Sequence, residues 1–213
     1  MRSEPIGEKM TAPTTWKTAD IVAATRGKLL CGKMTQTFSG IAIDSRTVAR
    51  DDLFIPVKGE THDGHRFLAA ARDNDVRGFV IEADKVDPIQ IQGLTAGDVS
   101  CVAVADTTVA LGDIAASYRR RFDVSVAAIT GSVGKTTTRE MTAAIVSQRY
   151  RTVSSRKNFN NEFGLPLTLF RLNADTEWAV VELGMNHPGE ISRLADICLP
   201  DIGIITNIGP VHL

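Results

Sequence analysis

The sequence predicts an α/β protein in which a small mixed α/β domain precedes a domain built on a parallel sheet covered by helices. Three observations favour this class. Hydrophobic residues make up 43% and charged residues 23% of the 213 residues, as in ordinary globular proteins. After residue 122, near-continuous apolar runs alternate with helix-like segments, the pattern of strands buried on both faces. A glycine-rich segment joins the first of these runs to a helix.

In the first part of the chain, the composition predicts a frayed tail at residues 1–15, followed by the small domain at residues 16–105. This domain is expected to begin with a short helix from Trp16 that stops at Gly27. A second helical stretch lies at residues 65–75. Short β-branched runs with turn residues between them predict strands at residues 38–46, 52–57, 77–83 and 99–105.

The second part, residues 106–213, is entered through a helix predicted over residues 107–122. We interpret the arginines at 119–121 as a solvated last turn that complements the helix dipole. Further apolar runs predict buried strands at residues 123–130, 176–184 and 201–209. Helices are predicted at residues 131–148, 166–172 and 188–199.

Composition excludes several classes of protein. The 24 basic residues balance 25 acidic ones, and aromatic residues make up only 6%, which argues against a nucleic-acid binder. No apolar run reaches the length of roughly 18 residues that a membrane span needs, so no membrane insertion is expected. The three cysteines have no metal-site or disulfide spacing, and the N-terminus has no apolar signal region. We therefore expect reduced thiols and a cytoplasmic location.

The glycine-rich segment carries the strongest chemical signal. It reads Gly131, Ser132, Val133, Gly134, Lys135, Thr136, Thr137. Backbone amides of such a loop and the helix N-terminus after it bind an anion, the lysine reaches phosphates, and the first threonine can ligate Mg²⁺. Ile129 stands where the general phosphate-loop motif has a glycine, and an incidental lysine in a glycine-rich turn is the alternative. The strand–loop–helix context favours a site for ATP and Mg²⁺.

Two later residues are expected beside this loop. Glu182 ends an apolar run, and His212 follows the last predicted strand by a few residues. Since the carboxyl ends of parallel strands meet at one sheet edge, both side chains are expected to lie near the phosphates. Carboxylate oxygen suits Mg²⁺, although Glu182 could also be an ordinary polar strand end.

Four segments of the second part, in this order, resemble the middle domain of the Mur ligases, which build the peptide stem of bacterial peptidoglycan: AITGSVGKTTT, NFNNEFGLPLTLF, VVELGMNHPGEI and ITNIGPVHL. The family's phosphate loop has this G-x-x-G-K-[ST] form, which accounts for Ile129. Upstream, IAIDSRTVARDDLFIPVKGETHDGHRF resembles the UDP-binding N-terminal domain of the family. The resemblance implies a UDP-sugar-binding domain followed by part of an ATPase domain.

Within the family, the loop and the NFNNEFGLPLTL segment resemble most the members that add D-alanyl-D-alanine to UDP-N-acetylmuramoyl-tripeptide. The chemistry implied is phosphorylation of a substrate carboxylate by ATP, followed by attack of the dipeptide's amine on the acyl phosphate. The members that add diaminopimelate or lysine in the preceding step share the N-terminal domain and remain an alternative. A nucleotide-binding fragment without catalytic competence is a second alternative.

The resemblance also implies roles for single residues. Lys135 contacts the phosphates, Thr136 and Glu182 hold Mg²⁺, and His212 helps to bind a second cation. One amide of Asn160 or Asn161 approaches the nucleotide or metal, with ordinary turn chemistry as the alternative.

In the N-terminal domain, Ser45 and Arg46 match the family's DSR element near the uridine diphosphate, with an ordinary strand end and a salt bridge as the alternative. Asp63 and His65 match a wall of the UDP-sugar pocket. A metal site made by His62 and His65 is disfavoured, because no further ligands accompany them.

The family has three domains, and this chain stops at Leu213, directly after the histidine. The resemblance therefore implies that the rest of the middle sheet and the C-terminal domain are missing. We expect these 213 residues to bind nucleotide weakly at most and to lack ligase turnover. We also expect an exposed strand edge that favours aggregation, and a monomer if the protein is intact.

Overall fold

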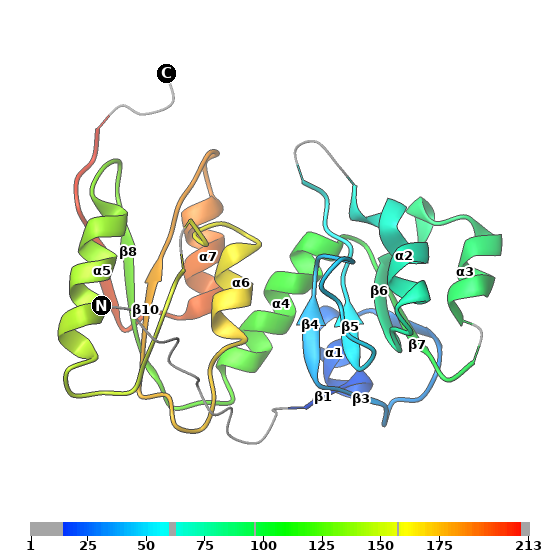
Figure 1. Ribbon diagram of the computed structural model, residues 1–213. Coiled ribbons are helices and arrows are strands. Elements are labelled where there is room, and N and C mark those ends of the chain that lie inside the picture. Colours follow the sequence, from blue (N-terminus) through cyan, green and yellow to red (C-terminus); the bar gives the residue numbers. More distant parts are fainter. Residues whose placement is uncertain (1–14, 60–62, 96, 157, 210–213) are drawn as a thin grey trace, which may run out of the picture.

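The computed structural model describes residues 15–59, 63–95, 97–156 and 158–209. Two lobes lie side by side, each with its own sheet, and the long helix α4 (Thr107–Arg119) runs between them (Figure 1). The predicted division near residue 105 falls just before this helix, and the division itself stays a prediction.

The N-terminal lobe holds a five-stranded sheet in the order β2-β7-β6-β5-β4. Four of the strands run parallel, and the edge strand β2 runs antiparallel to β7. The strands are β2 (Lys28–Cys31), β4 (Gly40–Ala42), β5 (Asp52–Phe54), β6 (Gly78–Glu82) and β7 (Ser100–Val104). A separate antiparallel pair joins β1 (Trp16–Lys17) to β3 (Thr37–Phe38).

Helices cover both faces of this sheet. Its helical segments are α1 (Thr18–Thr25), α2 (Leu68–Asp73), α3 (Pro88–Thr95) and two short 3₁₀ turns, Gly64–Phe67 and Ala83–Lys85. Alternate residues of β6 point to opposite faces, as the period of a strand requires. Phe79 and Ile81 pack in one core with Leu68 of α2, whereas Val80 packs in the other core with Ile21 of α1.

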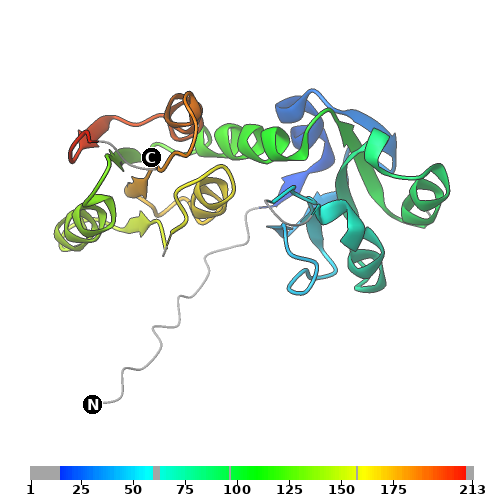
Figure 2. The same ribbon diagram turned by 90° about the horizontal axis from the view of Figure 1, so that it is seen from above.

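The second lobe holds a four-stranded, wholly parallel sheet in the order β11-β8-β10-β9. Its strands are β8 (Ser125–Thr130), β9 (Thr152–Ser154), β10 (Trp178–Glu182) and β11 (Ile202–Ile205). Its helices are α5 (Lys135–Val146), α6 (Gly164–Leu169) and α7 (Glu190–Cys198). Helix α5 covers one face, and α4, α6 and α7 lie on the other (Figure 2). The predicted parallel α/β class is confirmed.

One predicted helix needs correction, and sequence reasoning missed two further elements. The helix expected from Trp16 begins only at Thr18, because Trp16 and Lys17 pair with β3, and Arg26 in the left-handed region rather than Gly27 ends it. Helix α3 and strand β9 were not predicted from the sequence. Both segments are short and lack a clear apolar period, so tertiary packing decides their conformation.

The last strand, β11, was predicted to be buried and is not. Ile202 and Ile205 are 46% and 61% exposed. The cause is position: β11 is the edge strand of the described sheet and pairs only with β8.

The arginine cluster at the end of α4 was also misjudged. Arg119 is buried, and its guanidinium donates to the carbonyl oxygens of Cys198 at 3.0 Å and Val124 at 2.9 Å. It thereby ties the end of α4 to the end of α7 and to the start of β8. Arg120 is exposed, as the prediction requires, and Arg121 forms an ion pair with Asp20 at 3.0 Å.

The three cysteines are free. Burial raises the pKa of the Cys101 and Cys198 thiols to about 12, which keeps both protonated at neutral pH. Among the helices of the described ranges, none is both long enough and apolar enough to cross a membrane.

Candidate functional site: a phosphate loop beside a buried carboxylate

The glycine-rich loop connects the end of β8 to the start of α5. Gly131 has a φ of 133° and Gly134 a φ of 87°, both in the region that favours glycine. A Cβ on Gly131 would also collide with the hydroxyl of Thr206. The loop therefore requires glycine at residue 131, the extra glycine that the general phosphate-loop motif lacks.

Lys135 begins α5 and folds back over the loop. Its ammonium group donates to the carbonyl oxygen of Gly131 at 2.6 Å and to that of Ser132 at 3.3 Å. Its Nζ therefore lies beside the loop backbone, within reach of a phosphate bound in the loop. Thr137, in the first turn of the same helix, is exposed.

The segment that follows β11 supports the loop from the other side. The Asn207 side-chain oxygen accepts from the Val133 amide at 2.8 Å, and the Asn207 carbonyl accepts from the Ser132 amide at 3.1 Å. The Thr206 hydroxyl donates to the Val133 carbonyl at 2.6 Å. Sequence reasoning missed both residues, because Thr and Asn after a strand are also ordinary turn residues.

Glu182 is the centre of the site. It ends β10, and its side chain is 3% exposed. One carboxylate oxygen accepts from the Thr136 hydroxyl at 3.0 Å, and the other accepts from the Asn160 side-chain amide at 2.9 Å. Three residues that the sequence proposed separately, from α5, from β10 and from the asparagine segment, are thus in direct contact.

Arg139 is a fourth member of this cluster that the sequence did not indicate. Its Nε lies 4.0 Å from a Glu182 carboxylate oxygen, and both side chains are 3% exposed. Four residues after Lys135 on an amphipathic helix, it looks in sequence like part of a solvated face. The signal that could have found it is its position on the same side of α5 as Lys135.

Asn161 makes different hydrogen bonds from Asn160. Its side-chain oxygen accepts from the amides of Phe163 and Gly164 at 3.2 and 3.0 Å, and it thus caps α6. That helix begins at Gly164 rather than at the predicted Pro166. A nucleotide contact of Asn161 stays a prediction. His212 and His62 lie outside the described residues.

The donor set at Glu182 suits a hard divalent cation. A threonine hydroxyl and a carboxylate are oxygen ligands of the kind that Mg²⁺ prefers, and they meet next to the phosphate loop. Within the described ranges, no group of three or more His, Cys, Asp and Glu residues could hold a metal by itself. A cation here would need further ligands, such as water or phosphate oxygens.

In the N-terminal lobe, Ser45 is buried and Arg46 is exposed at the end of the segment after β4. Arg46 is paired with its neighbour Asp44, with Nη2 at 2.6 Å and Nε at 2.9 Å from the carboxylate oxygens. These hydrogen bonds lower the pKa of Asp44 to about 2. This salt bridge was the alternative to diphosphate binding in the sequence analysis, and the structure shows that it forms.

Asp63 and His65 form a pair in which both ring nitrogens of the histidine have partners. Nδ1 lies 2.6 Å from the Asp63 carboxylate, and Nε2 accepts from the Glu82 amide at 3.1 Å. Lys85 bridges the carboxylates of Glu82 at 2.5 Å and Asp63 at 3.7 Å. Because His65 is buried, its ring faces the lobe's interior, and Asp63 is the more exposed of the two.

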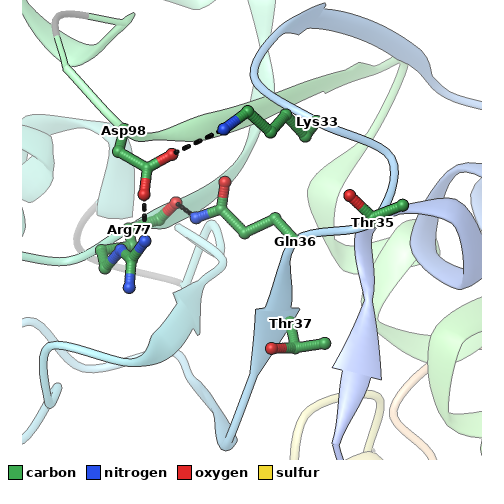
Figure 3. A pocket seen from close by; sticks show the side chains of 6 residues that line it. All are labelled: Lys33, Thr35, Gln36, Thr37, Arg77 and Asp98. Atoms are coloured by element: carbon green, nitrogen blue, oxygen red, sulfur yellow. Dashed lines mark hydrogen bonds and ion pairs between the residues drawn. The ribbon is translucent and has the colours of Figure 1, made fainter.

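A shallow hollow of about 180 Å³ lies elsewhere on the N-terminal lobe, between the β2–β3 connection and the segments that precede β6 and β7 (Figure 3). Asp98 in its wall forms ion pairs with both Arg77 and Lys33, the latter at 4.0 Å. Gln36 donates to the Arg77 carbonyl at 2.8 Å. Its charged side chains are two cations paired with one carboxylate, and it contains no residue of the phosphate loop.

Comparison with known families agrees with this site. Residues 129–213 match the Mur ligase middle domain, and residues 37–119 match a domain described as the Mur ligase family catalytic domain. The chain belongs to the Mur ligase family. The phosphate loop, Glu182 and the asparagine segment of this Mur ligase chain all fall within the middle-domain match.

Individual relatives extend the comparison. A UDP-N-acetylmuramoyl-tripeptide–D-alanyl-D-alanine ligase of Synechocystis sp. is 41% identical over 175 residues, which are 82% of this chain and 37% of that ligase. The crystal structure of MurF from Acinetobacter baumannii matches with a TM-score of 0.84 at 35% identity, over 95% of this chain and 43% of that one.

A third relative is the MurF ligase from Thermotoga maritima, whose crystal structure is a complex with ADP. It matches with a TM-score of 0.70 at 29% identity, over 81% of this chain and 38% of that one. This Mur ligase chain thus spans about two fifths of the length of the relatives that it matches.

Proposed function

We propose that this chain supplies the UDP-sugar-binding and ATP-binding parts of a ligase that joins D-alanyl-D-alanine to UDP-N-acetylmuramoyl-tripeptide. The observation that carries the proposal is the contact of Thr136 and Asn160 with the buried Glu182 carboxylate, next to the Lys135 loop. The names of the relatives from Synechocystis sp. and Acinetobacter baumannii support the choice of this ligase within the family.

The phosphate loop is the proposed ATP site. On binding, the Lys135 ammonium exchanges the carbonyl oxygens of Gly131 and Ser132 for oxygens of the β- and γ-phosphates. The amides of the loop and of the first turn of α5 add further donors. Phosphoryl transfer depends mainly on positioning and charge neutralisation, and these groups supply both.

Thr136 and Glu182 are the proposed protein ligands of Mg²⁺, and His212, outside the described residues, remains a proposed ligand of a second cation. When bound, the metal neutralises phosphate charge that would otherwise repel the substrate carboxylate. The Asn160 amide donates to one carboxylate oxygen of Glu182. This hydrogen bond keeps the other carboxylate oxygen oriented toward the Thr136 hydroxyl.

The N-terminal lobe is the proposed site of the UDP moiety. The exposed Arg46 guanidinium can exchange the Asp44 carboxylate for the diphosphate, which accepts the same two parallel hydrogen bonds. Asp63, held by His65 and Lys85, lies in the loop proposed to form a wall of this pocket. The free cysteines support a cytoplasmic location. The monomeric state stays a prediction.

The test is release of phosphate from ATP by this chain with Mg²⁺, UDP-N-acetylmuramoyl-tripeptide and D-alanyl-D-alanine, alongside direct titration of both nucleotides. Binding of ATP and of the UDP substrate supports the proposal. Release that requires the dipeptide would also show that these residues suffice for turnover. Release that instead requires diaminopimelate and the UDP-dipeptide substrate would assign the chain to the preceding step. Failure to bind either nucleotide contradicts the proposal.

A further inference from the structure

A buried pair of opposite charges lies directly behind the proposed metal ligands. Glu182 and Arg139 are each 3% exposed at the side chain, and their nearest charged atoms are 4.0 Å apart. Burying a carboxylate in its charged form is costly unless an opposite charge and hydrogen bonds compensate it. Arg139 supplies that charge, and Thr136 and Asn160 supply the hydrogen bonds.

Arg139 is fixed in place by contacts that do not involve a nucleotide. Its Nη1 donates to the carbonyl oxygen of Ser155, just after β9, and its Nη2 contacts the exposed Glu140 at 2.9 Å. The Ser155 hydroxyl in turn accepts from the Glu182 amide at 3.3 Å. The guanidinium is therefore held between α5, the end of β9 and the end of β10.

This arrangement has an electrostatic consequence. The Arg139 guanidinium lies between the carboxylates of Glu182 and the exposed Glu140, and within the described residues no group of three or more acidic, histidine or cysteine side chains forms a metal site. A free divalent cation that approaches Glu182 also approaches the Arg139 guanidinium, which lies about 4 Å from that carboxylate and repels the cation. A cation that arrives with a triphosphate brings its own negative ligands.

We propose that Arg139 is a positioning residue that keeps the Glu182 carboxylate oriented, and that its charge makes divalent-cation binding depend on the nucleotide. The metal then binds together with the phosphates and does not bind to the nucleotide-free chain. This inference rests on the proposed function, because it takes Glu182 as a ligand of the metal that accompanies ATP.

The experiment measures Mn²⁺ binding to the whole chain by electron paramagnetic resonance, first without nucleotide and then with a non-hydrolysable ATP analogue. The wild-type chain is expected to bind Mn²⁺ only with the analogue. Arg139→Gln is expected to bind free Mn²⁺ at least about tenfold more tightly than wild type, because one repulsive charge near the ligand is gone. Adding Glu182→Gln to that variant should remove the gain.

Two controls separate charge from folding. Arg139→Lys keeps the charge and should still require nucleotide for Mn²⁺ binding. Glu140→Gln removes the exposed partner of Arg139 and should behave as wild type. Circular dichroism melts identify any variant that fails to fold, and Arg139→Met then replaces Arg139→Gln because it keeps the apolar stem.

Three results would overturn the inference: tight Mn²⁺ binding by the wild-type chain without nucleotide, no gain in a folded neutral variant, or nucleotide-independent binding by Arg139→Lys. If neither neutral variant folds, the wild-type and Arg139→Lys measurements still decide it. A wild-type chain that binds no ATP analogue under any condition contradicts the proposed function instead, and the nucleotide titration detects that failure separately.

Discussion

The Thr136 hydroxyl donates to the Glu182 carboxylate at 3.0 Å although the two residues are 46 positions apart. The parallel register explains the contact. Glu182 pairs with Ile129 of β8, one residue before that strand ends, and the chain then turns through the loop into α5. The last residue of β10 is therefore level with the start of the loop, and a short helical turn brings Thr136 over it.

The conformation of Gly131 predicts that Gly131→Ala destabilises the protein. A side chain there would adopt an unfavourable positive φ and collide with the Thr206 hydroxyl. We expect a loss of about 1–3 kcal/mol in the free energy of unfolding, the usual cost of a strained backbone position. Urea unfolding followed by circular dichroism measures it.

Gly203→Ala is the matched control, because nothing lies within 4 Å of an added Cβ at that position and its φ is not positive. It should leave the free energy of unfolding nearly unchanged. Equal stabilities of the two variants would show that the loop does not adopt this conformation in solution.

The buried guanidinium of Arg119 predicts that Arg119→Met weakens the packing of α4 against the end of α7 and the start of β8. The substitution leaves the carbonyl oxygens of Cys198 and Val124 without their donor in a buried place. We expect a loss of about 1–3 kcal/mol. Arg120→Met, at the exposed next position, should change stability little. Thermal melts of the two variants compare them, and similar melting temperatures would contradict the contacts of Arg119.

The pKa of Asp44 tests the pairing with Arg46. In the folded chain the hydrogen bonds from Arg46 lower this pKa from 3.8 to about 2. The contact therefore stabilises the fold above pH 3.8, and this contribution is lost as the pH falls toward 2. In Arg46→Met the pKa should return toward 3.8, as measured by NMR titration of the side-chain carboxyl. The control Arg50→Met should leave the pKa of Asp44 near 2. An Asp44 pKa that is the same in Arg46→Met as in wild type would refute the pairing.

Much of the fold follows from local pattern. The buried strand at β8, the glycine loop and helix α5 were predictable because apolar runs, glycines and helical periods are all local signals. The edge position of β11 was not, because its apolar residues look the same whether or not a neighbour covers them. Burial of an edge is a property of the whole sheet.

The site shows the same division. Thr136, Lys135 and Glu182 could be named from the motif and from strand ends, whereas Arg139 and Asn207 could not. An arginine on a helix is exposed in most sequences, and only the tertiary contacts with Ser155 and Glu182 show that this one is buried. The contact of Asn160 with Glu182 and the helix cap of Asn161 likewise depend on which side chain turns inward.

The central claim is that the Lys135 loop binds the phosphates of ATP. Isothermal titration of a non-hydrolysable ATP analogue with Mg²⁺ into wild type, Lys135→Ala and the control Arg151→Ala tests it most directly. Lys135→Ala should lose about 10- to 100-fold in affinity, the equivalent of one charge-assisted hydrogen bond, while Arg151→Ala keeps the wild-type value. Unchanged affinity of a folded Lys135→Ala protein would contradict the account.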